Sequence, residues 1–304
     1  MANIIAIVWD FDKTLVDGYM QEPIFEEYRY DATQFWKDVN SLPEKYLEEQ
    51  NVRVNPDTIY LNHFIKLAKN GTFKGLNNEK LKSLGEKLKF YNGVPEIFES
   101  TKKAIEDNSL YQAYDIKVEH YIVSTGMSQI IKGSKVIDYV EDVWGCELIE
   151  GEDNEGNSCI SELGYTIDNT SKTRALFEIN KGVNKEGVSD VNLKIPEELR
   201  RVPFVNMVYV ADGPSDIPAF SLVNKNEGAT FAIYPKGDIK AMKQVEQLRS
   251  DNRINMYAEA DYSEGTTAHM WLINKITEFA DRIVKEEKQK LAKYTDVNTP
   301  KHLI

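Results

Sequence analysis

The chain begins with a short apolar run that ends abruptly in two carboxylates. Ile4–Trp9 is rich in β-branched residues and leads directly into Asp10-Phe11-Asp12-Lys13-Thr14. An uninterrupted apolar run of this length is typical of a strand buried on both faces of a parallel sheet. Because side chains alternate along a strand, Asp10 and Asp12 are expected on the same side, at the edge where open α/β sheets bind ligands. Two neighbouring carboxylates repel each other, so the pair predicts a divalent cation or a shared proton.

Composition excludes several classes of protein. The 304 residues are 41% hydrophobic and 28% charged, which is ordinary for a globular chain with one large domain or two. The sequence has no apolar run of ~18 residues and no secretion signal, so we expect no membrane partner and a cytoplasmic protein. The net charge of −12 argues against a nucleic-acid partner but leaves small phosphorylated substrates open, because a bound cation can reverse the local charge.

Further strand-like and helix-like segments alternate along the rest of the chain. Three more short apolar runs are typical of buried strands, at Tyr121–Val123, Val205–Ala211 and Ala229–Ile233. Helical patterns are expected over residues 96–106, 127–143, 238–248 and 267–291, a further helix is expected to begin near Lys172, and a hairpin is expected over residues 146–163. Cys146 and Cys159 lie in that hairpin and are expected to be reduced thiols. The alternation predicts an α/β protein with a mainly parallel sheet.

Residues 19–90 contain no strand-like run. Their aromatic and aliphatic side chains recur at helical spacing, which predicts a bundle of several helices inserted after the first strand. We therefore expect residues 18–90 to form a helical cap over the strand ends, and residues 1–17 and 91–304 to form the core. The cap aromatics are expected mainly in the centre of the bundle; Arg29 and Arg53 either bind an anionic group of a substrate or lie on a solvated face.

Polar residues with catalytic chemistry follow the other predicted strands. Ser124 follows the second strand, Lys172 begins a helix, and Asp212-Gly213-Pro214-Ser215-Asp216 follows the next strand. Lys135 is an alternative to Lys172, but it lies inside a predicted helix soon after Ser124. Each of these signals is weak when it is taken alone.

Taken together, the four motifs resemble those of the haloacid dehalogenase superfamily of phosphatases and phosphotransferases, in the same order along the chain. The inserted helices and the hairpin before Lys172 resemble the phosphoserine phosphatase-like branch, which has a helical cap. The resemblance implies a three-layer, Rossmann-like core. Phosphoserine phosphatases have Ser after the second Asp and a Glu soon after the Thr, where this chain has Lys13 and Tyr19. The sequence therefore does not single out phosphoserine as the substrate.

The resemblance implies a magnesium-dependent phosphomonoester hydrolase that forms an aspartyl-phosphate on Asp10. Asp12 would protonate the leaving group and then activate water. Mg²⁺ would be bound by Asp10, the backbone carbonyl of Asp12 and Asp212, with Asp216 orienting a ligand or a bound water from just outside. The remaining implied residues bind the phosphoryl group of a small phosphorylated metabolite: Ser124, Thr125, Gly126 and Lys172.

Three other functions fit parts of the same pattern. A phosphotransferase or mutase would use the same residues with a second substrate in place of water. A receiver-type signalling module also has acidic residues, a hydroxyl and a Lys around Mg²⁺, but it is smaller and phosphorylates an Asp on a later strand. A phosphate-binding module without turnover is the third. The sequence does not predict the oligomeric state.

Overall fold

The computed structural model describes residues 3–183, 185 and 190–297. Its centre is a seven-stranded sheet with the strand order β4-β3-β2-β1-β5-β6-β7. Only the β3–β4 pair is antiparallel; the other neighbours run parallel. The strands are β1 (Asn3–Trp9), β2 (Ile116–Met127), β3 (Asp142–Glu152), β4 (Ser158–Tyr165), β5 (Met207–Ala211), β6 (Ala229–Tyr234) and β7 (Met256–Glu259). The predicted mainly parallel sheet is confirmed, whereas β7 escaped the sequence analysis because it is only four residues long.

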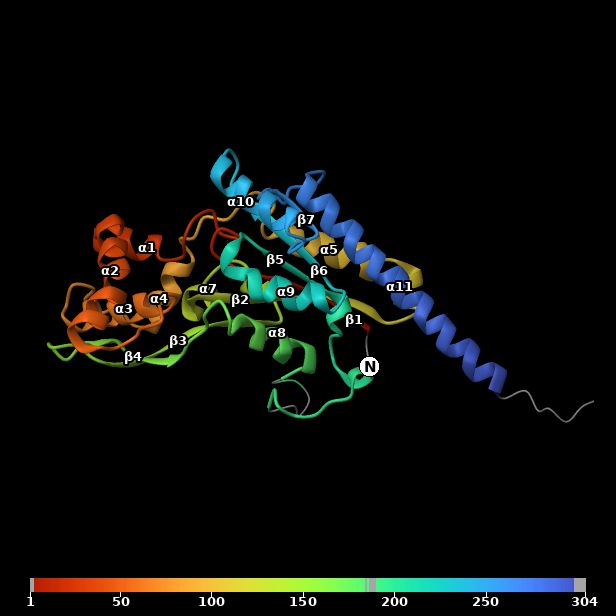
Figure 1. Cartoon of the computed structure of the whole chain (residues 1–304), viewed down its shortest axis with the longest axis horizontal. Coiled ribbons are helices and arrows are strands. Elements are labelled where there is room, and N and C mark those ends of the chain that lie inside the picture. Colours follow the sequence, from red (N-terminus) through yellow and green to blue (C-terminus); the bar gives the residue numbers. More distant parts are fainter. Residues whose placement is uncertain (1–2, 184, 186–189, 298–304) are drawn as a thin grey trace, which may run out of the picture.

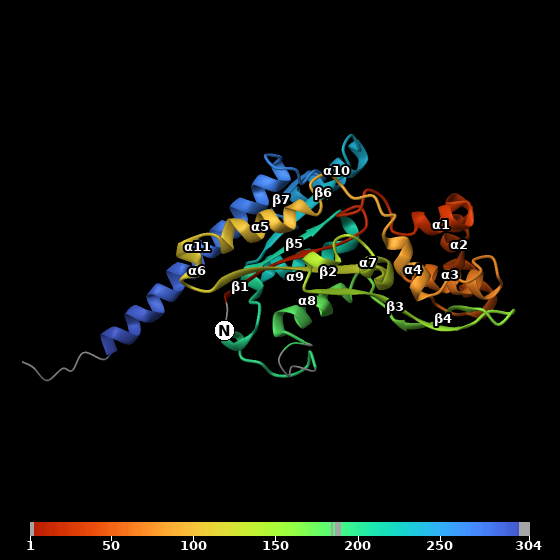
Figure 2. The ribbon, with the colours of Figure 1, turned by 180° about the vertical axis from the view of Figure 1, so that it is seen from behind.

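Helices cover both faces of this sheet and make a three-layer core (Figures 1 and 2). One face carries α5 (Glu96–Glu106) and α11 (Thr267–Val297), and the other carries α8 (Lys172–Lys181) and α9 (Ile217–Lys225). The short α6 (Ser109–Gln112) follows α5, and α10 (Ile239–Ser250) packs beside β6 and β7. The predicted three-layer α/β architecture is therefore confirmed.

A group of helices lies at one end of the sheet (Figure 1). It consists of α1 (Glu22–Tyr28), α2 (Ala32–Gln50), α3 (Ile59–Lys69) and α4 (Asn78–Gly85). The β3–β4 hairpin extends beneath these helices, and the Ile160 backbone N–H donates to the Leu76 carbonyl at 2.7 Å. The expected helices over residues 19–90 are therefore present, and residues of the hairpin pack with them. The division into a cap of residues 18–90 and a core stays a prediction.

The predicted helix over residues 127–143 is wrong. Instead, α7 (Ser128–Lys132) ends at Gly133, a short 3₁₀ turn follows at Ile137–Tyr139, and β3 begins at Asp142. Helix α4 crosses the chain here so closely that a Cβ on Gly133 would lie 1.7 Å from the Lys82 carbonyl oxygen. The helix stops because the two backbones meet, which is a tertiary contact that local sequence periodicity does not encode.

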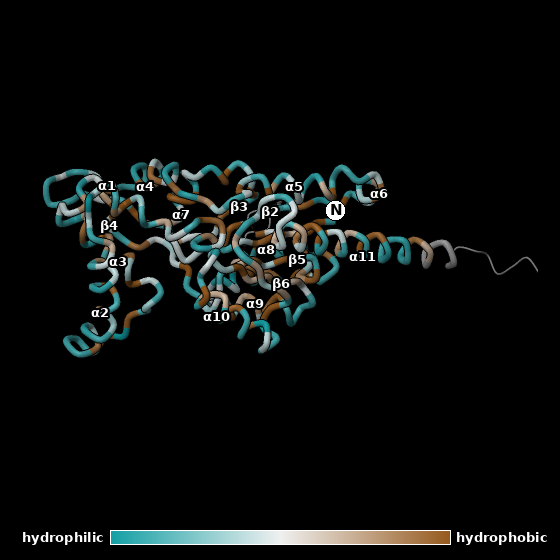
Figure 3. Tube along the Cα trace, turned by 90° about the horizontal axis from the view of Figure 1, so that it is seen from above, coloured by the Kyte–Doolittle hydropathy of each residue, from teal (hydrophilic) through white to brown (hydrophobic). Residues whose placement is uncertain are grey.

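Hydrophobic residues concentrate in the central strands (Figure 3). Residues Ile5–Trp9 of β1 are completely buried, as expected for a strand covered on both faces. Hydropathy alternates along α11, whose buried side chains recur at helical spacing and end at Val284. Beyond that residue the helix projects from the body of the protein (Figure 1).

Residues 236–297 help to hold the first strand and the loop after it. The Tyr262 hydroxyl donates to the Thr14 carbonyl at 2.7 Å, and its backbone N–H donates to the Asn92 carbonyl at 2.8 Å. On α11, Arg282 donates to the Val205 carbonyl just before β5. The C-terminal part of the chain thus helps to fix the loop that carries Asp12.

Two further findings concern the cysteines and the membrane. Cys146 and Cys159 are both buried and free, as expected, and they are not opposite each other, since Cys159 pairs with Gly151 and Cys146 with Met127. Among the described residues, no helix combines the length and the apolar character that a bilayer crossing requires.

We expect Gly93→Ala to destabilise the protein far more than Gly71→Ala. Both glycines have positive φ, so each Ala should cost about 1 kcal/mol in backbone strain. A Cβ on Gly93 would also lie 2.2 Å from the Tyr262 carbonyl carbon, whereas a Cβ on Gly71 would meet nothing within 4 Å. Overpacking should bring the total for Gly93→Ala to about 3 kcal/mol. Equal free energies of unfolding for the two variants, measured in urea, would refute the close approach to Tyr262.

Candidate active site

Three neighbouring strands bring the predicted motifs to one edge of the sheet. Trp9 at the end of β1 is paired with Ile122 of β2 on one side and with Val210 of β5 on the other. Asp10 therefore follows β1 between the end of β2, which carries Ser124, and Asp212, which follows β5. The parallel register explains why residues some two hundred positions apart in sequence converge here.

Lys172 forms ion pairs with two buried carboxylates at this edge of the sheet. Its Nζ lies 2.7 Å from Asp10 Oδ1 and 2.6 Å from Asp216 Oδ1, and all three side chains are almost fully buried. Its place at the start of α8 is fixed by Asp168, whose carboxylate accepts the Ser171 N–H at 2.7 Å and the Thr170 N–H at 3.0 Å. Asp168 thus orders the turn that leads into α8.

The alternative lysine lies elsewhere. Lys135 Nζ donates to the Val94 carbonyl at 2.6 Å and lies 4.9 Å from the centre of the Phe90 ring. Of the two lysines considered, only Lys172 contacts Asp10.

The carboxylates form a compact group that fits a small divalent cation. Asp10, Asp212 and Asp216 each place one carboxylate oxygen within 4.8 Å of the others. Asp216 is held firmly, because its Oδ1 also accepts the Tyr209 hydroxyl at 2.6 Å and its Oδ2 accepts the Ser215 hydroxyl at 2.8 Å. An all-oxygen donor set of this kind suits Mg²⁺. Asp12 is not one of these three residues.

Burial and mutual repulsion make these carboxylates hard to ionise. Burial raises the pKa of Asp10 to about 6, although Lys172 opposes the shift. Burial together with Asp10 raises the pKa of Asp12 to about 8 and that of Asp212 to about 7. Burial alone would lower the pKa of Lys172, but Asp10 and Asp216 outweigh it and raise that pKa. Raised carboxyl pKa values mark a site that favours a proton or a cation.

Asp12 is held by the segment that leads to the helical group. Its Oδ1 accepts the Met20 backbone N–H at 2.8 Å. The fully buried Met20 side chain reaches the end of β2, where its sulfur accepts the Met127 N–H at 3.1 Å. A Cβ on Gly126 would lie 2.1 Å from the Met20 methyl carbon, so Gly126 leaves the room that this contact needs.

The expected phosphoryl-binding residues lie at the end of β2. Ser124 is buried, and its Oγ accepts the Gly126 N–H at 3.0 Å, so the hydroxyl proton remains available to another acceptor. Thr125 is half-buried, and its carbonyl accepts the Tyr60 hydroxyl from α3 at 2.9 Å. The geometry thus places both residues at the same edge of the sheet as Asp10.

Sequence reasoning missed four residues that support the site. Thr14 donates to Asp10 Oδ2 at 3.2 Å, and its proximity to the Asp pair was a usable signal. Met20 was concealed in an unpatterned turn. Tyr209 was hidden among apolar residues of a buried strand, and Ser215 looked like an ordinary turn residue. Arg29 and Arg53 are exposed, in agreement with the solvated alternative.

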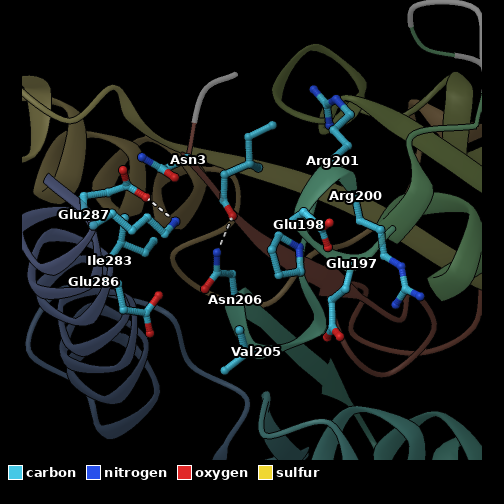
Figure 4. Close-up of a pocket in the computed structure, with 13 residues that line it drawn as sticks. Asn3, Glu197, Glu198, Arg200, Arg201, Val205, Asn206, Ile283, Glu286 and Glu287 are labelled. Atoms are coloured by element: carbon cyan, nitrogen blue, oxygen red, sulfur yellow. Dashed lines mark hydrogen bonds and ion pairs between the residues drawn. The ribbon is translucent and has the colours of Figure 1, made fainter. Parts of the chain in front are cut away.

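A separate cavity of about 620 Å³ lies at the opposite edge of the sheet (Figure 4). It is lined by Asn3 and Ile4 at the start of β1, by Glu197 and Arg200, and by residues of α11. The length of β1, about 20 Å, separates this cavity from Asp10. The cavity therefore does not belong to the carboxylate group.

We expect Lys172→Met to destabilise the protein strongly and in a pH-dependent way. Removing the cation leaves Asp10 and Asp216 buried without a counter-charge, which should cost about 3–5 kcal/mol at pH 8. The cost should shrink at pH 5, because these carboxyl groups can then take up protons. Urea unfolding at both pH values tests this expectation.

Lys135→Met is the matched control. Lys135 is exposed and contacts no carboxylate, so its removal should cost about 1 kcal/mol or less at either pH. A loss of stability for Lys172→Met that equals the loss for Lys135→Met would contradict the buried bridge.

Known proteins resemble this chain in sequence and in fold. An uncharacterized protein of Borreliella burgdorferi is 37% identical over 287 residues, which are 90% of this chain and 97% of that protein. A Saccharolobus solfataricus protein named probable ribonuclease FAU-1 is 28% identical over 236 residues, 72% of this chain and 49% of that protein. No protein-family model matches the chain.

Among solved structures, a substrate-bound phosphoserine phosphatase is similar in fold. It superposes with a TM-score of 0.51 and 16% identity, and the match covers 87% of this chain and 97% of that one. At this identity the likeness concerns the fold alone. The chain therefore belongs to one family with the uncharacterized Borreliella protein, and it shares the fold of phosphoserine phosphatase.

Proposed function

We propose that the protein is a Mg²⁺-dependent phosphomonoesterase that acts on a small phosphorylated substrate through an aspartyl-phosphate on Asp10. The observation that carries the proposal is the buried Lys172 bridge between Asp10 and Asp216, with Asp212 beside it. This arrangement joins a carboxylate nucleophile, a fixed positive charge and a group of oxygen ligands at one strand edge. The shared fold with phosphoserine phosphatase is consistent with it.

The carboxylate group would hold the metal ion. Asp10, Asp212 and the backbone carbonyl of Asp12 would be its ligands, and Asp216, fixed by Tyr209 and Ser215, would hold a ligand or bound water in place. When bound, Mg²⁺ would offset the negative charge of the substrate phosphate and of the attacking carboxylate.

Asp10 is oriented for attack by two donors. Lys172 binds its Oδ1, and Thr14 binds its Oδ2. The Lys172 ammonium would also neutralise a phosphoryl oxygen, so that the nucleophile and the phosphate can approach each other. Ser124, with Thr125 and Gly126, would donate hydrogen bonds to the remaining phosphoryl oxygens.

Asp12 has the properties of a general acid and base. In the protein without a metal, burial and the charge of Asp10 raise its pKa to about 8, and a protonated Asp12 can donate a proton to the leaving alkoxide oxygen. The carboxylate left behind can then take a proton from the water that hydrolyses the aspartyl-phosphate. The Met20 N–H on Oδ1 holds the carboxyl group in one orientation during both steps.

Assays with different phosphoryl acceptors and substrates distinguish this function from the alternatives. A phosphotransferase or mutase would pass the phosphoryl group to a second substrate, and adding an alcohol acceptor would then yield a transfer product. A phosphate-binding module would show no turnover. The net charge of −12 does not favour RNA, and an RNA oligomer serves as the control substrate for the ribonuclease named among the relatives.

We expect release of phosphate from a generic aryl phosphate that requires Mg²⁺. Asp10→Asn should abolish turnover, and Asp12→Asn should lower kcat by about 10²–10⁴-fold. The exposed Asp138→Asn, an identical change far from the site motifs in sequence, should behave like the parent. Phosphate release that is independent of Mg²⁺, or an Asp10→Asn variant as active as the parent, would end the proposal.

We also expect the metal-free protein to lose stability as the pH rises from about 4 to 8. The pKa values of Asp10, Asp12 and Asp212 are raised from 3.8 to about 6, 8 and 7. The folded state therefore binds more protons than the unfolded state in this window, and the free energy of unfolding falls as pH increases.

Addition of Mg²⁺ should reverse this loss. Because protons compete with the cation for the same oxygens, the increase in melting temperature should be larger at pH 8 than at pH 5. A sodium salt of equal ionic strength is the control. Melting temperatures that rise with pH without metal, or that respond equally to both salts, would contradict the assigned carboxylate group.

A further inference from the structure

A buried tyrosine fixes one end of the ion-pair bridge that Lys172 forms between Asp10 and Asp216. The Tyr209 hydroxyl donates to Asp216 Oδ1 at 2.6 Å, and Lys172 Nζ donates to the same oxygen at 2.6 Å. An ionised carboxylate has about four lone-pair sites, which its two oxygens share equally. Both sites of Oδ1 are therefore in use. Because Ser215 takes one site of Oδ2, the site left for a ligand or a bound water is on Oδ2.

A second buried tyrosine fixes the Asp10 end of the bridge through Thr14. The Thr14 hydroxyl donates to Asp10 Oδ2 at 3.2 Å, and the Thr14 carbonyl accepts the Tyr262 hydroxyl at 2.7 Å. Thr14 lies in the turn that follows β1 and is completely buried. The hydrogen bond from Tyr262 therefore anchors the residue that orients the second oxygen of Asp10.

The two tyrosines approach the bridge from opposite faces of the sheet. The Tyr209 ring packs on Phe220 of α9, with ring centroids 5.5 Å apart. The Tyr262 ring packs on Trp9 with centroids 5.5 Å apart, and Trp9 in turn contacts Phe98 of α5. Helices α9 and α5 cover opposite faces (Figures 1 and 2). The bridge thus has one tyrosine on either side.

The hydroxyls of both tyrosines are already committed within the protein. Tyr209 and Tyr262 are 0% and 1% exposed. Each hydroxyl has a single proton, which a protein oxygen accepts. A hydroxyl in this state does not donate to a phosphoryl oxygen as well. The contribution that remains open to both residues is to hold the reacting carboxylates in place.

We propose that Tyr209 and Tyr262 are positioning residues that hold the bridge from both faces of the sheet and thereby set the rate of phosphoryl transfer, an inference that rests on the proposed phosphatase function. One hydroxyl fixes Asp216 directly, and the other fixes Asp10 through Thr14. Lys172 connects the two carboxylates, so a shift at either end reaches the nucleophile. Attack by Asp10 depends on its alignment with the phosphorus, and small displacements slow such a step.

The test removes each hydroxyl and keeps its ring, in Tyr209→Phe, Tyr262→Phe and the double variant. With an aryl phosphate and saturating Mg²⁺, each single variant should lower kcat by about tenfold or more. KM should stay within about twofold of the parent value, because substrate binding is not affected. The double variant should lose little more than the slower single variant, because residues that act as one unit are not additive. Circular dichroism at the assay temperature gives the folded fraction, so that kcat is expressed per folded molecule.

Mg²⁺ binding supplies a readout that does not depend on turnover. Without the hydroxyl of Tyr209, Asp216 has one donor fewer to fix its orientation and that of its free Oδ2 site. Isothermal titration calorimetry with Mg²⁺ alone should therefore give a dissociation constant about tenfold higher for Tyr209→Phe than for the parent.

Two other buried tyrosines provide matched controls. Tyr121→Phe is the control for the strand tyrosine, because the Tyr121 hydroxyl also donates to a carboxylate, that of Glu119. This pair binds Arg201, which lines the cavity at the opposite edge of the sheet. Tyr111→Phe is the control for the other variant, because the Tyr111 hydroxyl donates to Asp281 on α11 at 2.8 Å. Both controls should leave kcat, KM and the Mg²⁺ dissociation constant as in the parent.

The outcomes distinguish this inference from the function on which it rests. Mg²⁺-dependent hydrolysis by the parent, with kcat values for the two single variants equal to those of their controls, would overturn the positioning role and leave the phosphatase intact. A double variant whose loss equals the product of the two single losses would do the same, as would a rise in KM as large as the fall in kcat. If one variant does not fold, the other and its own control decide. Absence of any Mg²⁺-dependent hydrolysis by the parent would overturn both proposals.

Discussion

The structure depends on one buried cation placed between two buried carboxylates. Lys172 Nζ lies 2.7 Å from Asp10 Oδ1 and 2.6 Å from Asp216 Oδ1, and all three side chains are almost fully buried. Without the lysine, two negative charges would be buried at the carboxyl ends of β1 and β5 with nothing to offset them. The bridge ties the first strand, the start of α8 and the turn after β5 into one unit, and the proposed chemistry uses that unit.

The other carboxylates explain why a bridge alone is insufficient. Asp12 and Asp212 are close to Asp10 but form no ion pair among the described residues, and burial and the charge of Asp10 raise their pKa values. A proton on Asp12 would offset one of these negative charges, and a cation beside Asp212 would offset the other. In the proposed function, the same imbalance that destabilises the metal-free protein would prepare Asp12 to carry a proton and Asp212 to bind a metal, so stability and function would have a common origin.

Much of this arrangement could be predicted from the sequence, for a physical reason. Parallel strands covered on both faces are apolar throughout, so their ends are marked by the first polar residues, and Asp10, Ser124 and Asp212 were found in this way. Contacts that depend on tertiary packing left no such mark. The end of α7 at Gly133 is set by α4, and Tyr209 reads as one more apolar strand residue although its hydroxyl holds Asp216.

The measurement that tests the central claim most directly is chemical trapping of the phosphorylated carboxylate. The protein would be mixed with Mg²⁺ and a phosphomonoester, quenched in acid, and reduced with borohydride, which converts an acyl phosphate of aspartate to homoserine. Peptide mass spectrometry then identifies the modified residue. Our account predicts homoserine at Asp10 alone. Modification at Asp12 or Asp212, or turnover with no modified aspartate, would contradict it.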